Sequence, residues 1–147
     1  MAVLLVRHAK AGNPGRWPGP DDLRPLTAKG DAQAAGLVEA YAGFDIGRVL
    51  SSPYLRCVQT VAPLAADRGA VVEACADLAE GHGHAGVALV RSLFAGAASD
   101  VVLCTHGDVI EEVLDALGVV RDGWTAKGAT WVLDAAGARH LPPPEAG

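Results

Sequence analysis

Two histidines and two arginines stand next to short apolar runs of this chain, at positions that suit phosphate chemistry. Arg7 and His8 come directly after the opening apolar run, and His106 directly follows another one, residues 101–105. Arg56 lies just after a third. Guanidinium groups hold phosphoryl oxygens through charge-assisted bonds, while an imidazole can attack phosphorus or donate to its oxygens. These residue types therefore indicate a site that binds and cleaves a phosphate group.

Short apolar runs bounded by polar residues are typical of buried strands, and here they alternate with helical patterns. Strands are expected over residues 2–6, 48–52, 71–74, 101–105 and 129–133, and helices over 28–42, 53–67, 86–97 and 108–117. This alternation predicts an α/β fold, a three-layer α/β/α sandwich with a mostly parallel central sheet. Because parallel strands end at one edge of a sheet, both histidines are expected to meet there.

Three residues mark helix ends in this prediction. Thr27 is expected to cap the first helix, Pro53 to lie in the first turn of the second, and Gly69 to follow its last turn. Arg56 then lies in the first turn of the second helix, from which its side chain can return to the edge where the strands end.

Length and charge limit the class of protein. The 147 residues, 50% of them hydrophobic, suit one globular domain over residues 1–147, with a frayed tail from about residue 140. The net charge is −5, yet residues 1–60 hold seven Lys or Arg against five Asp or Glu. A locally basic part of an acidic chain favours a small anionic ligand over a nucleic acid.

The cysteines and the apolar runs bear on location. Cys57, Cys75 and Cys104 are an odd set without metal-type spacing, which favours free thiols in a reducing compartment. The opening apolar run is shorter than the core of a signal peptide and has no basic region before it. Apolar runs of the ~20 residues that a membrane helix needs are absent from the sequence. A cytoplasmic protein without a membrane partner is therefore expected.

Two further cations are candidates for substrate binding. Lys10 follows His8 closely, and Arg24 lies in a loop over residues 11–25 that contains four prolines and three glycines. Loops of this length are often functional, so the loop is either a solvated connector or a segment that faces substrate.

A phosphatase also needs an acid when the leaving group is an alkoxide. Glu80, in an expected flexible polar loop over residues 77–84, is the candidate, with a solvated loop carboxylate as the alternative. His82 and His84 in the same loop have no third ligand nearby, so no metal site is expected.

Four segments carry the candidate residues in chain order: Arg7-His8-Ala9, Arg24-Pro25-Leu26-Thr27-x-x-Gly30, Ser51-Ser52-Pro53-Tyr54-Leu55-Arg56-Cys57-Val58-Gln59-Thr60 and Thr105-His106-Gly107. Together they resemble the signature segments of the histidine phosphatase superfamily, which has the phosphoglycerate-mutase-like fold. The resemblance implies that His8 is the nucleophile and that Arg7, Arg56 and His106 bind the phosphoryl group. It places Glu80 where the family usually has its general acid, and it implies no metal or other cofactor.

The spacing between Glu73 and Asp100 leaves no room for the cap insertion of the larger family members. The chain therefore resembles the short SixA-type phosphohistidine phosphatases, and also the histidine-phosphatase domains attached to some MutT-type Nudix hydrolases. An uncovered pocket can admit a phosphorylated protein side chain or a nucleotide, and it has few walls to select a small metabolite.

Three functions remain open on the sequence. The leading one is hydrolysis of a phosphomonoester or a protein phosphohistidine through phospho-His8. The second is a nucleotide phosphohydrolase, in which Arg16, Trp17 and Arg24 hold a base or extra phosphates. The third is a non-catalytic phospho-ligand-binding module. The expected partners are thus a phosphorylated small molecule, a nucleotide or a phosphoprotein, and the sequence leaves the oligomeric state open.

Overall fold

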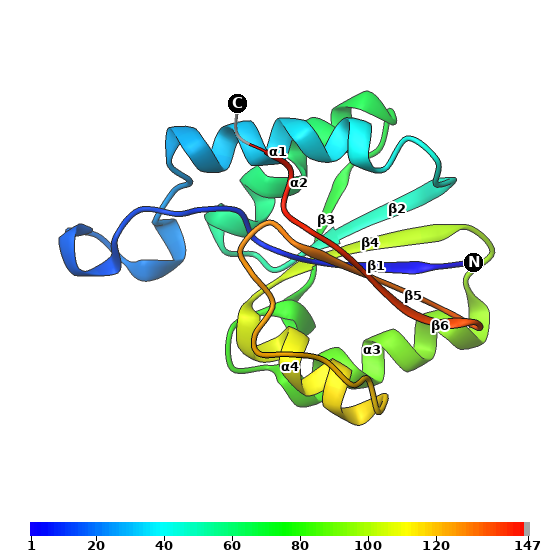
Figure 1. Ribbon diagram of the computed structural model, residues 1–147. Helices are drawn as coiled ribbons and strands as arrows, with labels where there is room; N and C mark the ends of the chain where they lie inside the picture. The colour runs from blue at the N-terminus through cyan, green and yellow to red at the C-terminus, as the bar shows by residue number, and fades with distance from the viewer. Residues whose placement is uncertain (146–147) are drawn as a thin grey trace.

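A single six-stranded sheet, in the order β3-β2-β4-β1-β5-β6, forms the centre of the computed structural model, which describes residues 1–145 (Figure 1). The strands are β1 (Val3–Arg7), β2 (Ile46–Ser51), β3 (Val72–Ala74), β4 (Asp100–Thr105), β5 (Thr130–Asp134) and β6 (Gly137–Leu141). The α-helices are α1 (Ala28–Ala40), α2 (Leu55–Asp67), α3 (Gly83–Gly96) and α4 (Gly107–Ala116), and the short 3-10 helices are η1 (Pro14–Arg16), η2 (Asp21–Leu23) and η3 (Ala76–Leu78).

Helices cover both faces of this sheet, with α1 and α2 over one face and α3 and α4 over the other (Figure 1). Along β1, Leu4 and Val6 belong to the core on the α1–α2 side, whereas Val3 and Leu5 belong to the core on the α3–α4 side. All four side chains are fully buried. Burial on both faces explains the continuous apolar run of the central strand. The predicted three-layer α/β/α sandwich is confirmed.

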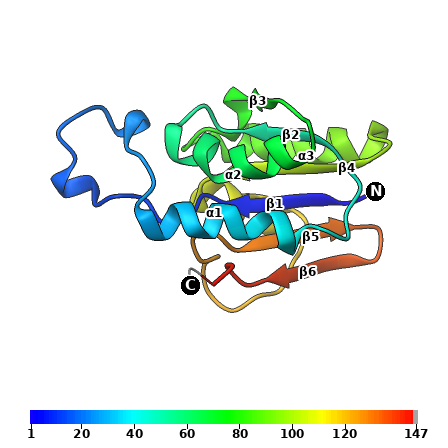
Figure 2. The same ribbon diagram turned by 90° about the horizontal axis from the view of Figure 1, so that it is seen from above.

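The sheet brings the ends of three strands to one edge. β4 is parallel to both β1 and β2, and β3 is parallel to β2, while β5 is antiparallel to β1 and β6 to β5. In this register Arg7 of β1 lies opposite Thr105 of β4, and Ser51 of β2 lies opposite Cys104. The residues that follow these strands are therefore neighbours in space. The segment between β1 and α1 extends beyond this edge (Figure 2).

Strand β6 was not expected, and it corrects the prediction for the end of the chain. His140 and Leu141, assigned to a frayed tail, lie in β6 and pair with Trp131 and Thr130 of β5. Most of β6 is exposed, so its sequence lacks the apolar alternation that identifies a strand. Residues 146–147 of the expected tail lie outside the described residues.

The predicted helix ends are mostly confirmed. The hydroxyl oxygen of Thr27 caps α1, and Gly69 follows α2 with a φ of +62°. Pro53 is not in the first turn of α2, because it precedes the N-cap residue Tyr54. The Tyr54 amide instead donates to the hydroxyl of Ser52 at 3.3 Å, so Pro53 belongs to the turn that enters the helix.

The segment expected as a flexible polar loop over 77–84 is more ordered than that. It contains the end of η3 and the start of α3, and Leu78 is fully buried. The Leu78 carbonyl accepts a hydrogen bond from the hydroxyl of Thr105, which ties the segment to the end of β4. Only η3 and α3 separate β3 from β4 in the described residues. Among residues 1–145, none of the helices has the length and apolar character needed to cross a bilayer.

Candidate active site

The two candidate histidines lie side by side at the edge of the sheet. The His8 amide donates to the Thr105 carbonyl at 3.0 Å and so extends the ladder between β1 and β4 by one step. His106, the next residue after Thr105, occupies the N-cap position of α4. The two imidazole centroids are 5.6 Å apart, and both side chains are buried. The predicted meeting of the two strand ends is present in the structure.

One ring nitrogen of His8 is fixed by a backbone carbonyl. Nδ1 lies 2.8 Å from the carbonyl oxygen of Ala9, which can only accept, so Nδ1 carries the proton. In the neutral imidazole Nε2 is then the nitrogen with a free electron pair. The Ala9 amide in turn donates to the Thr60 hydroxyl at 2.9 Å, which holds this backbone in place.

The surroundings keep His8 neutral. Burial, followed by the positive charges of Arg56, His106 and Arg7, lowers the pKa of His8 to about 3, although the bond to the Ala9 carbonyl acts in the opposite direction. A neutral imidazole with an unprotonated Nε2 is the form that can act as a nucleophile.

Arg7 lies against the start of α4 and the segment that follows this helix. Its Nη1 donates to the Thr125 carbonyl at 2.8 Å. Desolvation lowers the pKa of Arg7, while the carboxylates of Glu111 and Asp108 raise it. A Cβ on Gly107 would lie 3.0 Å from Cζ of Arg7, so glycine at the start of α4 leaves room for the guanidinium group.

Arg56 is buried in the first turn of α2, as predicted. Its Nη1 donates to the Asp21 carbonyl at 2.9 Å and its Nη2 to the Asp21 carboxylate at 3.1 Å. Glu80 lies 3.7 Å from Nη2, and the guanidinium carbon is 4.9 Å from the centre of the Tyr54 ring. Two carboxylates from separate loops thus converge on this arginine.

His106 is surrounded by polar and aromatic side chains. Nε2 lies 2.8 Å from the Ser52 hydroxyl, and the Tyr54 ring meets the imidazole edge-on at 4.6 Å between centroids. Within residues 1–145, Nδ1 of His106 and Nε of both Arg7 and Arg56 are buried without a hydrogen-bond partner. Leaving such groups unpaired is unfavourable, and phosphoryl oxygens are acceptors that would satisfy them.

The remaining candidates lie around this centre. Arg24 donates to the Gly12 carbonyl at 2.6 Å and to the Asp21 carboxylate at 3.0 Å, so it orders the loop beside Arg56. The Lys10 side chain is exposed at the rim. Glu80 is half exposed and within reach of the site, as the sequence suggested.

Several residues of the site have no signal in the sequence motifs. Asp21 contacts Arg56, and Thr125 contacts Arg7, through tertiary structure alone. Lys127 lies in the turn before β5, where the Gly128 amide donates to the carbonyl oxygens of Arg7 and His8 at 3.0 and 3.2 Å. Only the antiparallel placement of β5 beside β1 brings this lysine to the same edge.

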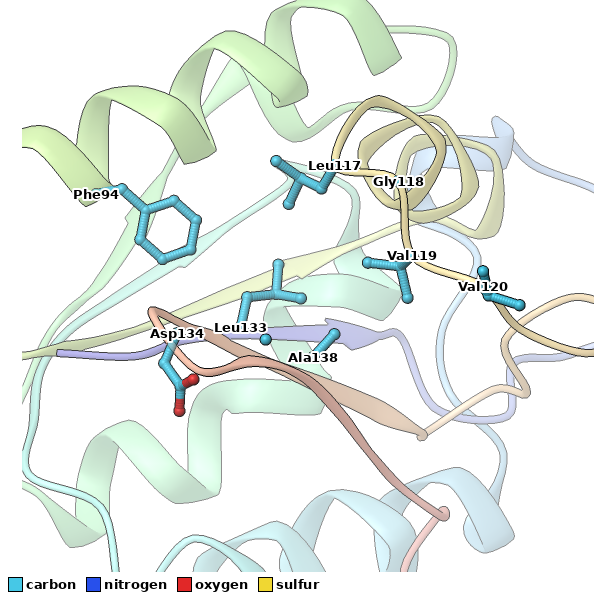
Figure 3. A pocket seen from close by; sticks show the side chains of 9 residues that line it. Phe94, Leu117, Gly118, Val119, Val120, Leu133, Asp134 and Ala138 are labelled. Carbon is cyan, nitrogen blue, oxygen red and sulfur yellow. The ribbon is translucent and has the colours of Figure 1, made fainter.

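A separate pocket of about 430 Å³ lies near the opposite edge of the sheet (Figure 3). It lies between the end of α3, the segment after α4 and the turn that joins β5 to β6, and its lining residues are Phe94, Leu117, Gly118, Val119, Val120, Leu133, Asp134, Gly137 and Ala138. The charged group in this lining is the Asp134 carboxylate, which would repel an anion. The phosphate chemistry therefore belongs to the edge with the histidines.

Comparison with known sequences identifies the family. Residues 3–88 match the profile of the histidine phosphatase superfamily, branch 1. The chain belongs to the histidine phosphatase superfamily. The matched part contains the signature segments around His8 and Arg56. His106 lies beyond the matched part, directly after β4.

Two curated relatives come from mycobacteria. An "8-oxo-(d)GTP phosphatase" of Mycolicibacterium smegmatis is 34% identical over 156 residues, which cover 97% of this chain and 48% of the relative. The "Uncharacterized protein Rv0525" of Mycobacterium tuberculosis is 42% identical over 83 residues, which cover 53% of this chain and 39% of that protein. The chain thus spans half or less of the length of these relatives.

Solved structures share the fold. The protein histidine phosphatase SixA in complex with tungstate superposes with a TM-score of 0.80 at 21% identity, covering 99% of this chain and 97% of that one. A SixA-type putative phosphohistidine phosphatase from Agrobacterium tumefaciens gives a TM-score of 0.75 at 23% identity, covering 97% and 98%. At these identities the likeness establishes the phosphoglycerate-mutase-like fold.

Proposed function

We propose that this chain is a phosphatase that uses His8 as a covalent nucleophile. The observation that carries the proposal is the 2.8 Å bond from Nδ1 of His8 to the Ala9 carbonyl, because it leaves Nε2 unprotonated beside Arg7 and Arg56. Membership of the histidine phosphatase superfamily supports it.

The reaction has two displacements at phosphorus. The electron pair of His8 Nε2 forms a P–N bond while the bond from phosphorus to the leaving oxygen breaks, and that oxygen keeps the electron pair. Water then attacks phospho-His8, the P–N bond breaks and inorganic phosphate leaves. Arg7, Arg56 and His106 offset the charge on the equatorial oxygens, so the scheme requires no metal.

Glu80 is the proposed general acid when the leaving group is an alkoxide, because its carboxylate lies 3.7 Å from Arg56 at the open edge. Lys10 and Arg24 are proposed to guide the substrate through their charge. The proposed substrates are phosphomonoesters or a protein phosphohistidine, since only η3 and α3 separate β3 from β4 and no inserted subdomain lies between them.

The first test is loss of the nucleophile. The variant His8→Ala is expected to abolish p-nitrophenyl phosphate hydrolysis and the acid-quenched labelled phosphoenzyme, whereas His140→Ala, on the exposed strand β6, is expected to keep both. Full activity of His8→Ala would refute the mechanism. Binding of phosphate by the wild type without turnover or phosphoenzyme would favour a non-catalytic phospho-ligand-binding module.

A second candidate function is a nucleotide phosphohydrolase of the same fold. It is favoured by the relative named 8-oxo-(d)GTP phosphatase, whose similarity covers 97% of this chain. A panel that contains a phosphorylated histidine-transfer domain, sugar phosphates and nucleoside di- and triphosphates separates the two candidates by comparison of kcat/KM.

The same proposal covers the domain organisation of the chain and its cellular compartment. Residues 1–147 are proposed to act as one domain, because both apolar cores of the described residues lie against one sheet. Cys57, Cys75 and Cys104 are free thiols, which is expected of a reducing compartment such as the cytoplasm.

A further inference from the structure

Lys127 is fixed beside the proposed nucleophile by its neighbour in the chain. The Gly128 amide donates to the carbonyls of both Arg7 and His8. A shift of the turn that carries Lys127 would break these bonds. Lys127 is therefore held next to the phosphoryl site, while its side chain is exposed at the rim.

Lys10 is also exposed and lies beside the same phosphoryl site, where its charge acts on Lys127. Its amide donates to Oε1 of Gln33 at 3.0 Å, and its carbonyl accepts from the Thr27 amide at 2.9 Å. The side-chain amide of Gln33 also packs against Gly128, where an added Cβ would lie 3.4 Å from its Cδ. Gln33 thus joins the two segments that carry Lys10 and Lys127.

These two lysines carry charge that the described chain does not neutralise. Asp21 pairs with Arg24 and Arg56, whereas neither Lys10 nor Lys127 forms an ion pair within residues 1–145. Partial desolvation, and then the charges of the arginines and Lys10, lower the pKa of Lys127. Beside the phosphoryl site the described chain therefore leaves two lysine charges without a carboxylate partner.

We propose that Lys127 and Lys10 form a second anion subsite, which holds the phosphoryl group next to the one that His8 accepts. The substrate class is then a phosphoanhydride with two adjacent phosphoryl groups, such as a nucleoside diphosphate. This inference rests on the proposed phosphatase function with His8 as nucleophile, and within it favours the second candidate, a nucleotide phosphohydrolase, over phosphomonoester or phosphohistidine substrates.

A phosphoanhydride substrate does not require Glu80 as a general acid. Nε2 of His8 bonds to the terminal phosphorus, the bond to the bridging oxygen breaks, and the nucleoside monophosphate leaves with the electron pair. Water then releases inorganic phosphate from His8. A phosphate leaving group is weakly basic, with a second pKa of about 6, so charge neutralisation by Lys127 and Lys10 replaces protonation by an acid.

The test compares two substrates in matched variants. For Lys127→Ala we expect kcat/KM for ADP to fall at least tenfold and kcat/KM for p-nitrophenyl phosphate to fall less than threefold. For Lys10→Ala we expect a larger loss of kcat/KM with ADP than with p-nitrophenyl phosphate. Lys127→Arg is expected to restore most of the activity with ADP. Lys29→Ala removes a lysine from the exposed start of α1 and is the control. Inorganic pyrophosphate, which has no base, is expected to follow ADP.

The outcomes separate the two proposals. Equal losses on both substrates, or no loss with ADP, would overturn the second subsite while leaving the phosphatase in place. If the lysine variants lose kcat/KM with ADP but not with pyrophosphate, the second subsite is also overturned, since the lysines would then act on the nucleoside. A wild-type protein that hydrolyses none of the substrates and forms no phosphoenzyme would instead refute the proposed function.

Discussion

His8 combines two properties that a nucleophilic imidazole needs. The bond from Nδ1 to the Ala9 carbonyl fixes which nitrogen is free, and burial among positive charges lowers the pKa to about 3. The free electron pair on Nε2 is therefore available across the physiological pH range, and His8 does not have to lose a proton before it attacks.

The same low pKa makes stability depend on pH. Between about pH 3 and the ordinary value of 6.5 the unfolded chain binds more protons than the folded one, so stability falls as the pH is lowered through this window. At pH 5 the contribution of His8 is a loss of about 2 kcal/mol. We expect His8→Gln to remove that loss, as measured by urea unfolding at pH 7 and pH 5. His140→Gln is the control, and an unchanged pH slope in His8→Gln would contradict the prediction.

For individual residues, the sequence predicted which side chains form the centre of the candidate site but not which residues surround them. Arg7, His8 and His106 directly follow or end apolar strands, so the register of the sheet alone brings them together. Asp21 lies in the short helix η2 and Lys127 in a turn. The positions of both depend on tertiary packing, and no short-range sequence pattern marks them. The structure establishes where the candidate residues lie, and the catalytic and binding roles of all of them stay predictions.

Helix α4 positions the site through a buried carboxylate. Glu111 accepts from the amide and hydroxyl of Thr125 at 3.1 and 2.9 Å, and its other oxygen pairs with Arg121 at 2.9 Å. The Thr125 carbonyl in turn accepts from Arg7. Glu111 therefore fixes the segment after α4 and, through it, Arg7 on one side of the proposed phosphate site.

Glu111→Gln is expected to disturb this arrangement. An amide cannot accept at every position that the carboxylate serves, so we expect a loss of about 1–3 kcal/mol in unfolding free energy. Because Arg7 loses its fixed partner, kcat/KM for p-nitrophenyl phosphate should fall about tenfold, equal to about 1.4 kcal/mol. Asp115→Asn, which also removes a carboxylate from Arg121 but leaves Thr125 bound, is the control. An equal loss in both variants would show that Arg121 pairing, and not the hold on Thr125, matters.

The elements that the sequence did not predict share a physical cause. β6 is an exposed edge strand, and η3 with the start of α3 contains glycines and few apolar residues, so neither has an amphipathic period. The central strands and α4 bury defined apolar faces, and they lie within one or two residues of their predicted ranges. Periodicity detects burial, and it fails where an element is half solvated.

The molecule as a whole extends its proline-rich segment beyond the sheet edge that carries the candidate phosphate site. Residues between β1 and α1 extend past the sheet (Figure 2), and η2 within them brings the Asp21 carboxylate to Arg56. Two cations of the site share this carboxylate, since Arg24 also binds it. A phosphoryl group that binds the terminal guanidinium nitrogens of Arg56 therefore competes with Asp21 for them.

Asp21→Asn is therefore expected to tighten phosphate binding. The Asp21 side chain is half exposed, so the pair is worth less than 1 kcal/mol and the dissociation constant should fall about threefold. Titration calorimetry with inorganic phosphate measures this directly. Asp22→Asn makes the same charge change one residue away and forms no ion pair in the described residues, so it should leave the constant near the wild-type value. Weaker binding in Asp21→Asn would mean that the carboxylate orients Arg56 for phosphate and does not compete with it.

The pairing of Asp21 with Arg56 also determines how dissolved salt acts on the protein. This guanidinium already has a tethered counterion, so an incoming phosphate exchanges with a group of the chain and releases few ions into solution. Arg56 is 1% exposed and weakly screened, whereas Lys10 and Lys127 face the solvent. Rising ionic strength will then weaken the hold on a second phosphate before the hold on the first. Selectivity between diphosphates and monophosphates will therefore depend on the ionic strength as well as on the residues of the chain.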